Sequence, residues 1–167
     1  MIPLIIIIIS LLLDGILTNY LPYLVGNLSL FTPLLTLVSI IMIYPFYKKK
    51  LKKYYITVLI TGIIYDLLYT NLLFINSIIF IIIAYINVLI NKRYKINFPS
   101  LIIYITFIIV IYESLYAILL IIFKLIPITI NKLLYKITHS ILINIIYAEV
   151  EYIVVKYFLK RNKISIN

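Results

Sequence analysis

The stretch TGIIYDLLYTNLLFINSIIFIIIAYI, residues 61–86, contains two apolar runs that meet at a short polar turn, and it places Asp66 four residues after Gly62. A carboxylate in such an apolar run is expected to have a structural or functional role, because an aspartate at the centre of a membrane helix raises the free energy of insertion by about 2.5 to 3.5 kcal/mol. The whole chain is similarly apolar: 65% of its 167 residues are hydrophobic and 12% are charged, against roughly 25% charged in soluble domains. The sequence is therefore that of a membrane protein.

The apolar runs predict an all-α, polytopic protein with about six transmembrane helices in one integral membrane domain over residues 1–167. Because each span takes about 20 residues, no soluble catalytic domain fits. Thr32 and Ser100 are the expected N-caps of the second and fifth spans. Spans three and four follow each other so closely that they should form a tight antiparallel hairpin. The predicted spans cover residues 2–20, 31–47, 54–70, 72–90, 100–123 and 139–159.

The basic residues predict the orientation. Twelve of the fifteen lysines and arginines lie at alternate ends of the predicted spans, in residues 48–53, 92–95 and 156–163. The positive-inside rule therefore places both termini in the cytoplasm, and it explains the net charge of +10 without nucleic acid as a partner. The other side carries Lys124, Lys132 and Lys136. Residues 127–137 form either a short helix in the outer interface or an irregular loop.

Carboxylates in the predicted spans are the main functional signal. With a rise of 1.5 Å per residue they lie at similar depths near the middle of the membrane, so we expect them to face protein or water. No lysine or arginine is expected at that depth, which leaves tyrosine hydroxyls as the expected donors. Glu149 and Glu151 are two residues apart and should point in very different directions. All five acidic residues belong to this set: Asp14, Asp66, Glu113, Glu149 and Glu151.

Three interpretations of these intramembrane polar residues stay open. They can join helices of this chain, they can contact a partner or ligand, or they can carry protons or cations. Gly62 lies one helical turn from Asp66 and would let a neighbouring helix approach closely. In the first interpretation the acids act as polar contacts within the fold, and in the second a helix from another protein satisfies them.

The sequence offers no motif for an active site, a metal or a cofactor. It has no cysteine and a single histidine, His139, so neither thiolate nor histidine-rich metal sites can form. We find no P-loop, no dinucleotide fingerprint and no hydrolase motif. We therefore predict no catalytic residue, no metal ligand and no cofactor, and the protein should not be an enzyme.

Residues 31 to about 90 resemble the rod shape-determining protein MreD. The resemblance rests on FTPLLTLVSIIMIYPF, on the lysine-rich loop that follows, and on the Gly-x-x-x-Asp helix with Gly62 and Asp66 before a short turn. Many members have glycine in that turn, where this chain has Thr70 and Asn71. The resemblance implies a multi-pass protein of the bacterial cell membrane. It also implies a non-enzymatic scaffold of the elongation machinery, working beside an MreC-like single-span protein, the MreB filament and a polymerase/transpeptidase complex in lateral peptidoglycan synthesis.

The alternative is a substrate-binding subunit of an energy-coupling-factor vitamin transporter, a class that the MreD family is thought to resemble. Such subunits often dock through an Ala-x-x-x-Ala pattern in the first span, and residues 2–20 contain no alanine. Identification of the proteins that purify with the chain from native membranes would separate the two functions.

Overall fold

A computed structural model describes residues 2–25, 33–70, 72–94, 97–124 and 129–161, and this part of the chain contains seven α-helices and no strand. The all-α prediction is confirmed. The helices are α1 (Ile2–Val25), α2 (Leu35–Met42), α3 (Tyr44–Tyr47), α4 (Leu51–Tyr69), α5 (Ile75–Arg93), α6 (Phe98–Ile122) and α7 (Ile130–Arg161).

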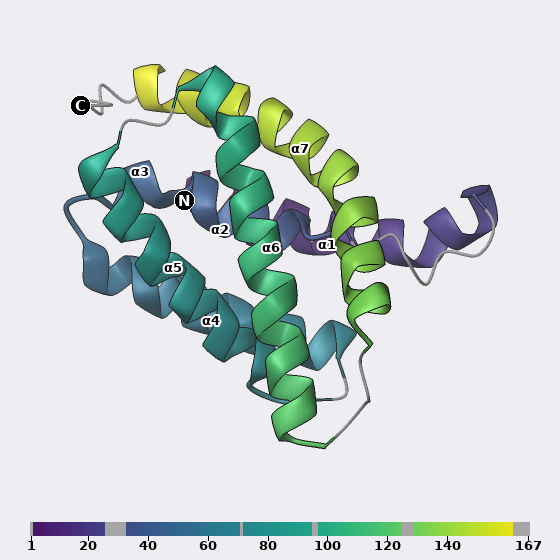
Figure 1. Cartoon of the computed structure of the whole chain (residues 1–167). Helices are drawn as coiled ribbons and strands as arrows, with labels where there is room; N and C mark the ends of the chain where they lie inside the picture. The colour runs from purple at the N-terminus through teal and green to yellow at the C-terminus, as the bar shows by residue number, and fades with distance from the viewer. Residues whose placement is uncertain (1, 26–32, 71, 95–96, 125–128, 162–167) are drawn as a thin grey trace.

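The short helix α2 lies at the centre of the molecule. All eight of its residues are buried, and it packs against α1, α5 and α7 (Figure 1). Around it, α4 pairs with α5 and α6 pairs with α7, while α5 also contacts α6. The close pairing of α4 and α5 agrees with the hairpin predicted for spans three and four. The last turns of α1 extend beyond the other helices (Figure 1).

The predicted span over residues 31–47 is two helices rather than one. Pro45 has no backbone N–H, so the carbonyl of Ile41 loses its usual helical donor. In its place, the Asn87 side-chain amide on α5 donates to the Ile41 carbonyl at 3.2 Å. The Tyr54 hydroxyl on α4 donates to the neighbouring carbonyl of Ile40 at 3.0 Å. Buried polar side chains of the α4–α5 hairpin therefore stabilise the break between α2 and α3.

Several other boundaries differ from the predictions. Thr32, the expected N-cap of the second span, lies outside the described residues, and α2 begins at Leu35. Ser100 is the third residue of α6 rather than its N-cap, although its hydroxyl does accept the Asn97 N–H at 2.9 Å. Residues 130–137 are neither a separate interfacial helix nor a loop, because they form the first turns of α7.

Three of the described helices have stretches long and apolar enough to cross a membrane: Ile2–Tyr20 of α1, Ile75–Arg93 and Phe98–Ile122. Large apolar side chains on their outer faces, such as Leu12 and Ile103, are 61% and 76% exposed, which is typical of side chains that face lipid. These helices support the assignment as a membrane protein. The count of six spans stays a prediction, since α2 is short and α4 and α7 carry charged residues.

Candidate functional site

Asp14 of α1 caps the start of α2. Its Oδ1 accepts the backbone N–H of Leu35 and its Oδ2 accepts that of Thr36, both at 2.8 Å. The Thr36 hydroxyl donates to the same Oδ2. Leu34, the N-cap residue of α2, has no side chain that could do this. The carboxylate therefore supplies from another helix the acceptor that a serine or aspartate N-cap normally provides, and it faces the positive end of the helix dipole.

Asp66 does the same for α5. The backbone N–H groups of Asn76 and Ser77 donate to its two oxygens, each at 3.1 Å. The side chains of these two residues add bonds of 2.8 and 2.9 Å. Phe74, the N-cap residue, has an apolar side chain and left-handed backbone with a φ of 73°. Since Thr70 also donates to Oδ1, five donors surround a carboxylate that is 0% exposed.

Gly62 lets α5 lie close enough to α4 for this cap to form. A Cβ atom at Gly62 would lie 2.5 Å from the Ser77 Cα, which is backbone and cannot swing away. The close approach that the sequence predicts is present here, and the neighbouring helix belongs to this chain. From α6, the Tyr112 hydroxyl donates to the Asn76 side chain at 2.7 Å. Three helices are thus joined around Asp66.

The donors to the aspartates differ from the expected ones. In the described residues, the groups that donate to Asp14 and Asp66 are backbone N–H groups and the side chains of threonine, asparagine and serine, not tyrosine hydroxyls. Tyrosines contribute one step further out, as Tyr112 does through Asn76. One sequence signal could have revealed the caps: α2 and α5 both begin after an apolar residue, Leu34 or Phe74, in place of a capping side chain.

Glu113 of α6 pairs with a cation, which corrects the expectation that none lies near it. Lys136 Nζ of α7 lies 3.5 Å from Glu113 Oε2 and 5.2 Å from the centre of the Tyr116 ring. The lysine can reach because residues 130–137 continue as part of α7 and run beside α6. The other oxygen of the glutamate, Oε1, is buried and has no hydrogen-bond partner among the described residues.

Glu151 of α7 ends a chain of hydroxyl groups that crosses three helices. Ser39 of α2 donates to Glu151 Oε2 at 2.9 Å and is also bonded to Ser10 of α1. Ser10 in turn lies 2.6 Å from the Tyr147 hydroxyl. Glu151 Oε1 is buried, and no group in the described part of the chain forms a hydrogen bond with it. This glutamate helps to join α1, α2 and α7, but with fewer bonds than either aspartate has.

Glu149 lies on a different side of α7 from Glu151, as their spacing predicts. Its side chain is half-buried, and within the described part of the chain it makes no hydrogen bond or ion pair. Beside it along the helix are Ile146, Val150 and Ile153, which are 55%, 56% and 62% exposed. Of the five predicted site residues with carboxylates, this is the one that the described fold leaves without a polar partner.

A comparison with protein families matches residues 1–162 to the rod shape-determining protein MreD. The chain belongs to the MreD family. The match confirms the resemblance and extends it from residues 31–90 to nearly the whole chain, including all five carboxylates. No curated protein and no solved structure matched the chain. Membership of this family points to a role in rod shape determination.

Proposed function

We propose that the chain is a non-enzymatic membrane scaffold of the bacterial cell-elongation machinery, supporting cell shape and lateral peptidoglycan synthesis. The observation that carries this proposal is the family match over residues 1–162. The geometry is compatible with it: the two aspartates are occupied by helix starts, so neither is available as a catalytic acid or nucleophile. The proposed location is the bacterial plasma membrane, which the chain crosses several times.

The proposed partner is an MreC-like single-span protein that packs on the outer face of α7. This differs from the partner contact that the sequence suggests, because Asp14 and Asp66 find their donors within the chain. Among the described residues Glu149 finds no donor, and a carboxylate that faces lipid at mid-membrane depth costs about 2.5 to 3.5 kcal/mol. A helix that brings a hydroxyl, amide or basic group to Glu149 and apolar side chains to Ile146 and Val150 would remove that cost.

The test of this function is depletion combined with purification from native membranes. Depletion of the chain from a rod-shaped host should give round or swollen cells, and the tagged chain should purify with a single-span MreC-like protein. The polymerase/transpeptidase complex and the MreB filament should follow directly or through that partner. If the chain instead retains a vitamin-like ligand and purifies with a transporter ATPase, the scaffold proposal is wrong and the transporter alternative replaces it.

The proposed orientation, with both termini in the cytoplasm, can be tested with single cysteines because the chain has none of its own. Lys50→Cys in the basic loop should resist a membrane-impermeant thiol reagent in intact cells and react after permeabilisation. Lys132→Cys at the start of α7 is the matched control and should react in intact cells. Labelling of the cysteine at position 50 in intact cells would contradict this topology.

A further inference from the structure

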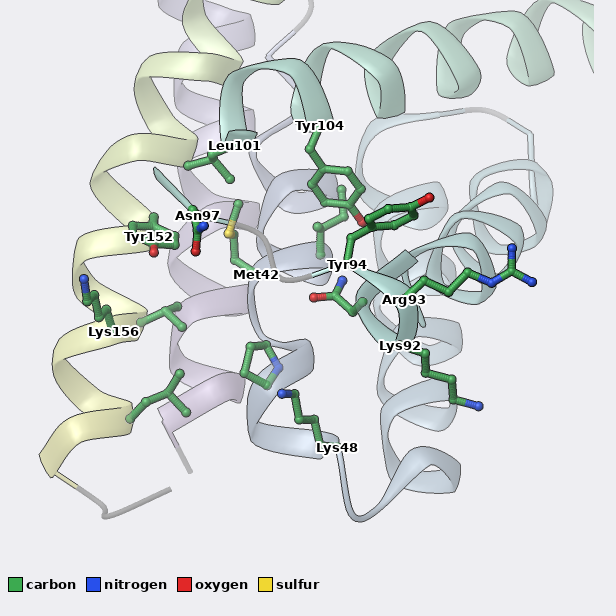
Figure 2. A pocket seen from close by; sticks show the side chains of 15 residues that line it. Met42, Lys48, Lys92, Arg93, Tyr94, Asn97, Leu101, Tyr104, Tyr152 and Lys156 are labelled. Atoms are coloured by element: carbon green, nitrogen blue, oxygen red, sulfur yellow. The ribbon is translucent and has the colours of Figure 1, made fainter. Parts of the chain in front are cut away.

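A cavity of about 550 Å³ lies where α2, α3 and the ends of α5, α6 and α7 meet (Figure 2). Its size falls in the range of small-molecule sites, about 300 to 1,000 Å³. The proposed scaffold function assigns no role to this cavity, and none of the five carboxylates lines it. The class of ligand must therefore be inferred from the residues that line the cavity.

Among the described residues, four cationic side chains line the cavity and no acidic side chain does. They are Lys48 after α3, Lys92 and Arg93 at the end of α5, and Lys156 of α7. Figure 2 shows Lys48 beside the opening with its amino group turned toward it, whereas Lys92 and Arg93 along one edge and Lys156 on the opposite wall have their charged ends turned outward at the rim. Cations gathered around a concave, low-dielectric wall produce a concentrated positive potential, which attracts anions.

The inner wall of the cavity is apolar. Met42 of α2, Leu101 of α6 and Val155 of α7 line it, and each is at most 7% exposed. A small, fully hydrated anion gains nothing from such a wall. A molecule with a phosphate at one end and hydrocarbon at the other matches both parts, because its charged end meets the lysines while its apolar end contacts the buried side chains.

The position of the cavity also fits a membrane lipid. Its cations come from the three basic groups, residues 48–53, 92–95 and 156–163, which the positive-inside rule assigns to one membrane surface. The structure places members of all three groups around one opening, as expected if the three groups lie at the same membrane surface. Basic pockets between transmembrane helices on the cytoplasmic side are a recognised way to bind anionic lipid headgroups.

We propose that this cavity binds the phosphate headgroup of an anionic membrane phospholipid, with the start of the acyl region against Met42, Leu101 and Val155. The inference rests on the cavity and its charges, and it is independent of the partner proposed for α7. A bound lipid would join α3, α5, α6 and α7 at one membrane surface. The cations around the cavity come from the end of α3, from α5 and from α7.

The test compares two double variants of the full-length protein that lose the same charge. Lys48→Gln with Lys156→Gln removes two cavity cations, whereas Lys52→Gln with Lys160→Gln removes two exposed cations that do not line it. Phosphatidylglycerol and phosphatidylcholine are titrated into the delipidated protein in detergent, and bound lipid is counted by native mass spectrometry. The cavity variant should bind phosphatidylglycerol at least about tenfold more weakly, and the control variant less than about threefold more weakly.

Equal weakening in the two variants would show general surface attraction and overturn the proposal, as would equal affinity for the neutral phosphatidylcholine. Inorganic phosphate is titrated as a competitor: if it binds as tightly as the phospholipid, the site takes free phosphate and the lipid proposal is wrong. Circular dichroism checks that each variant is folded. If the first cavity variant has lost helicity, Lys92→Gln with Arg93→Gln, both at exposed positions, replaces it with the same expected result.

Discussion

The aspartates and the glutamates of this chain occupy two different kinds of environment. Asp14 and Asp66 each accept two successive backbone N–H groups from the start of another helix, with three and five donors in all. Among the described residues, Glu113 and Glu151 each leave one buried oxygen without a hydrogen-bond partner, and Glu149 makes no polar contact. Carboxylates at similar predicted depth are therefore held differently: the aspartates cap helices of this chain, whereas Glu149, on the outer side of α7, is the one we propose to meet a partner helix.

The largest effect is expected at Asp66, where the most donors would lose their acceptor. Asp66→Leu should lower the free energy of unfolding by about 4 kcal/mol, because two backbone N–H groups and two side chains would be buried without partners. Asp66→Asn keeps one acceptor oxygen and should cost only about 1 to 2 kcal/mol and retain much of the function. Thermal unfolding in detergent, with accumulation in membranes, measures both.

Asp14 provides the internal comparison, since it has three donors where Asp66 has five. Asp14→Leu should destabilise in the same direction by a smaller amount. Equal loss in the leucine and asparagine variants at Asp66 would contradict the capping role and would indicate an obligatory charge or proton transfer instead.

A smaller effect is expected at the glycine that brings α5 close to Asp66. Gly62→Ala places a Cβ 2.5 Å from the Ser77 backbone and should cost about 2 kcal/mol through displacement of α5. Gly15→Ala is the comparison, because there the nearest atom, 2.8 Å from the added Cβ, is the Tyr69 hydroxyl, and the side chain can rotate away at the loss of its hydrogen bond to the Leu11 carbonyl without displacing a helix. Both changes gain the same helix propensity, so the difference between their unfolding temperatures isolates the packing. Equal stability would mean that α4 and α5 are not held this closely.

The smallest change in stability is expected at the ion pair between α6 and α7. Lys136→Gln removes the cation from the buried Glu113 and should cost about 1 to 2 kcal/mol, since the lysine is 34% exposed and part of the interaction is screened. Adding Glu113→Gln should restore most of that stability, because the remaining buried group is then neutral. A double-mutant cycle on thermal unfolding measures the coupling. Additive losses would show that the two side chains do not interact.

The apolar pattern predicts that the chain is all-α and where most of its helices lie, but it does not predict every helix boundary or the contacts of the carboxylates. Periodicity locates an apolar run but does not show that Pro45 divides one, or that Asn87 from a distant helix satisfies the carbonyl left free. The spacing of Gly62 and Asp66 correctly indicated a close helix contact. The apolar residues Leu34 and Phe74 show that α2 and α5 lack their own caps only once the backbone shows where these helices begin. The contact of Lys136 with Glu113 depends on α7 beginning well before the predicted span.

The central claim is that the aspartates act within the fold while the Glu149 face of α7 contacts a partner helix. Its most direct test is in vivo photo-crosslinking from Ile146, Val150 and Ile153 on α7, compared with the exposed α4 positions Ile60, Ile64 and Leu67. The account predicts crosslinks to one single-span protein from the α7 positions, lost on Glu149→Leu while the chain remains folded. Crosslinks from α4 alone, or α7 crosslinks that are unchanged by Glu149→Leu, would contradict it.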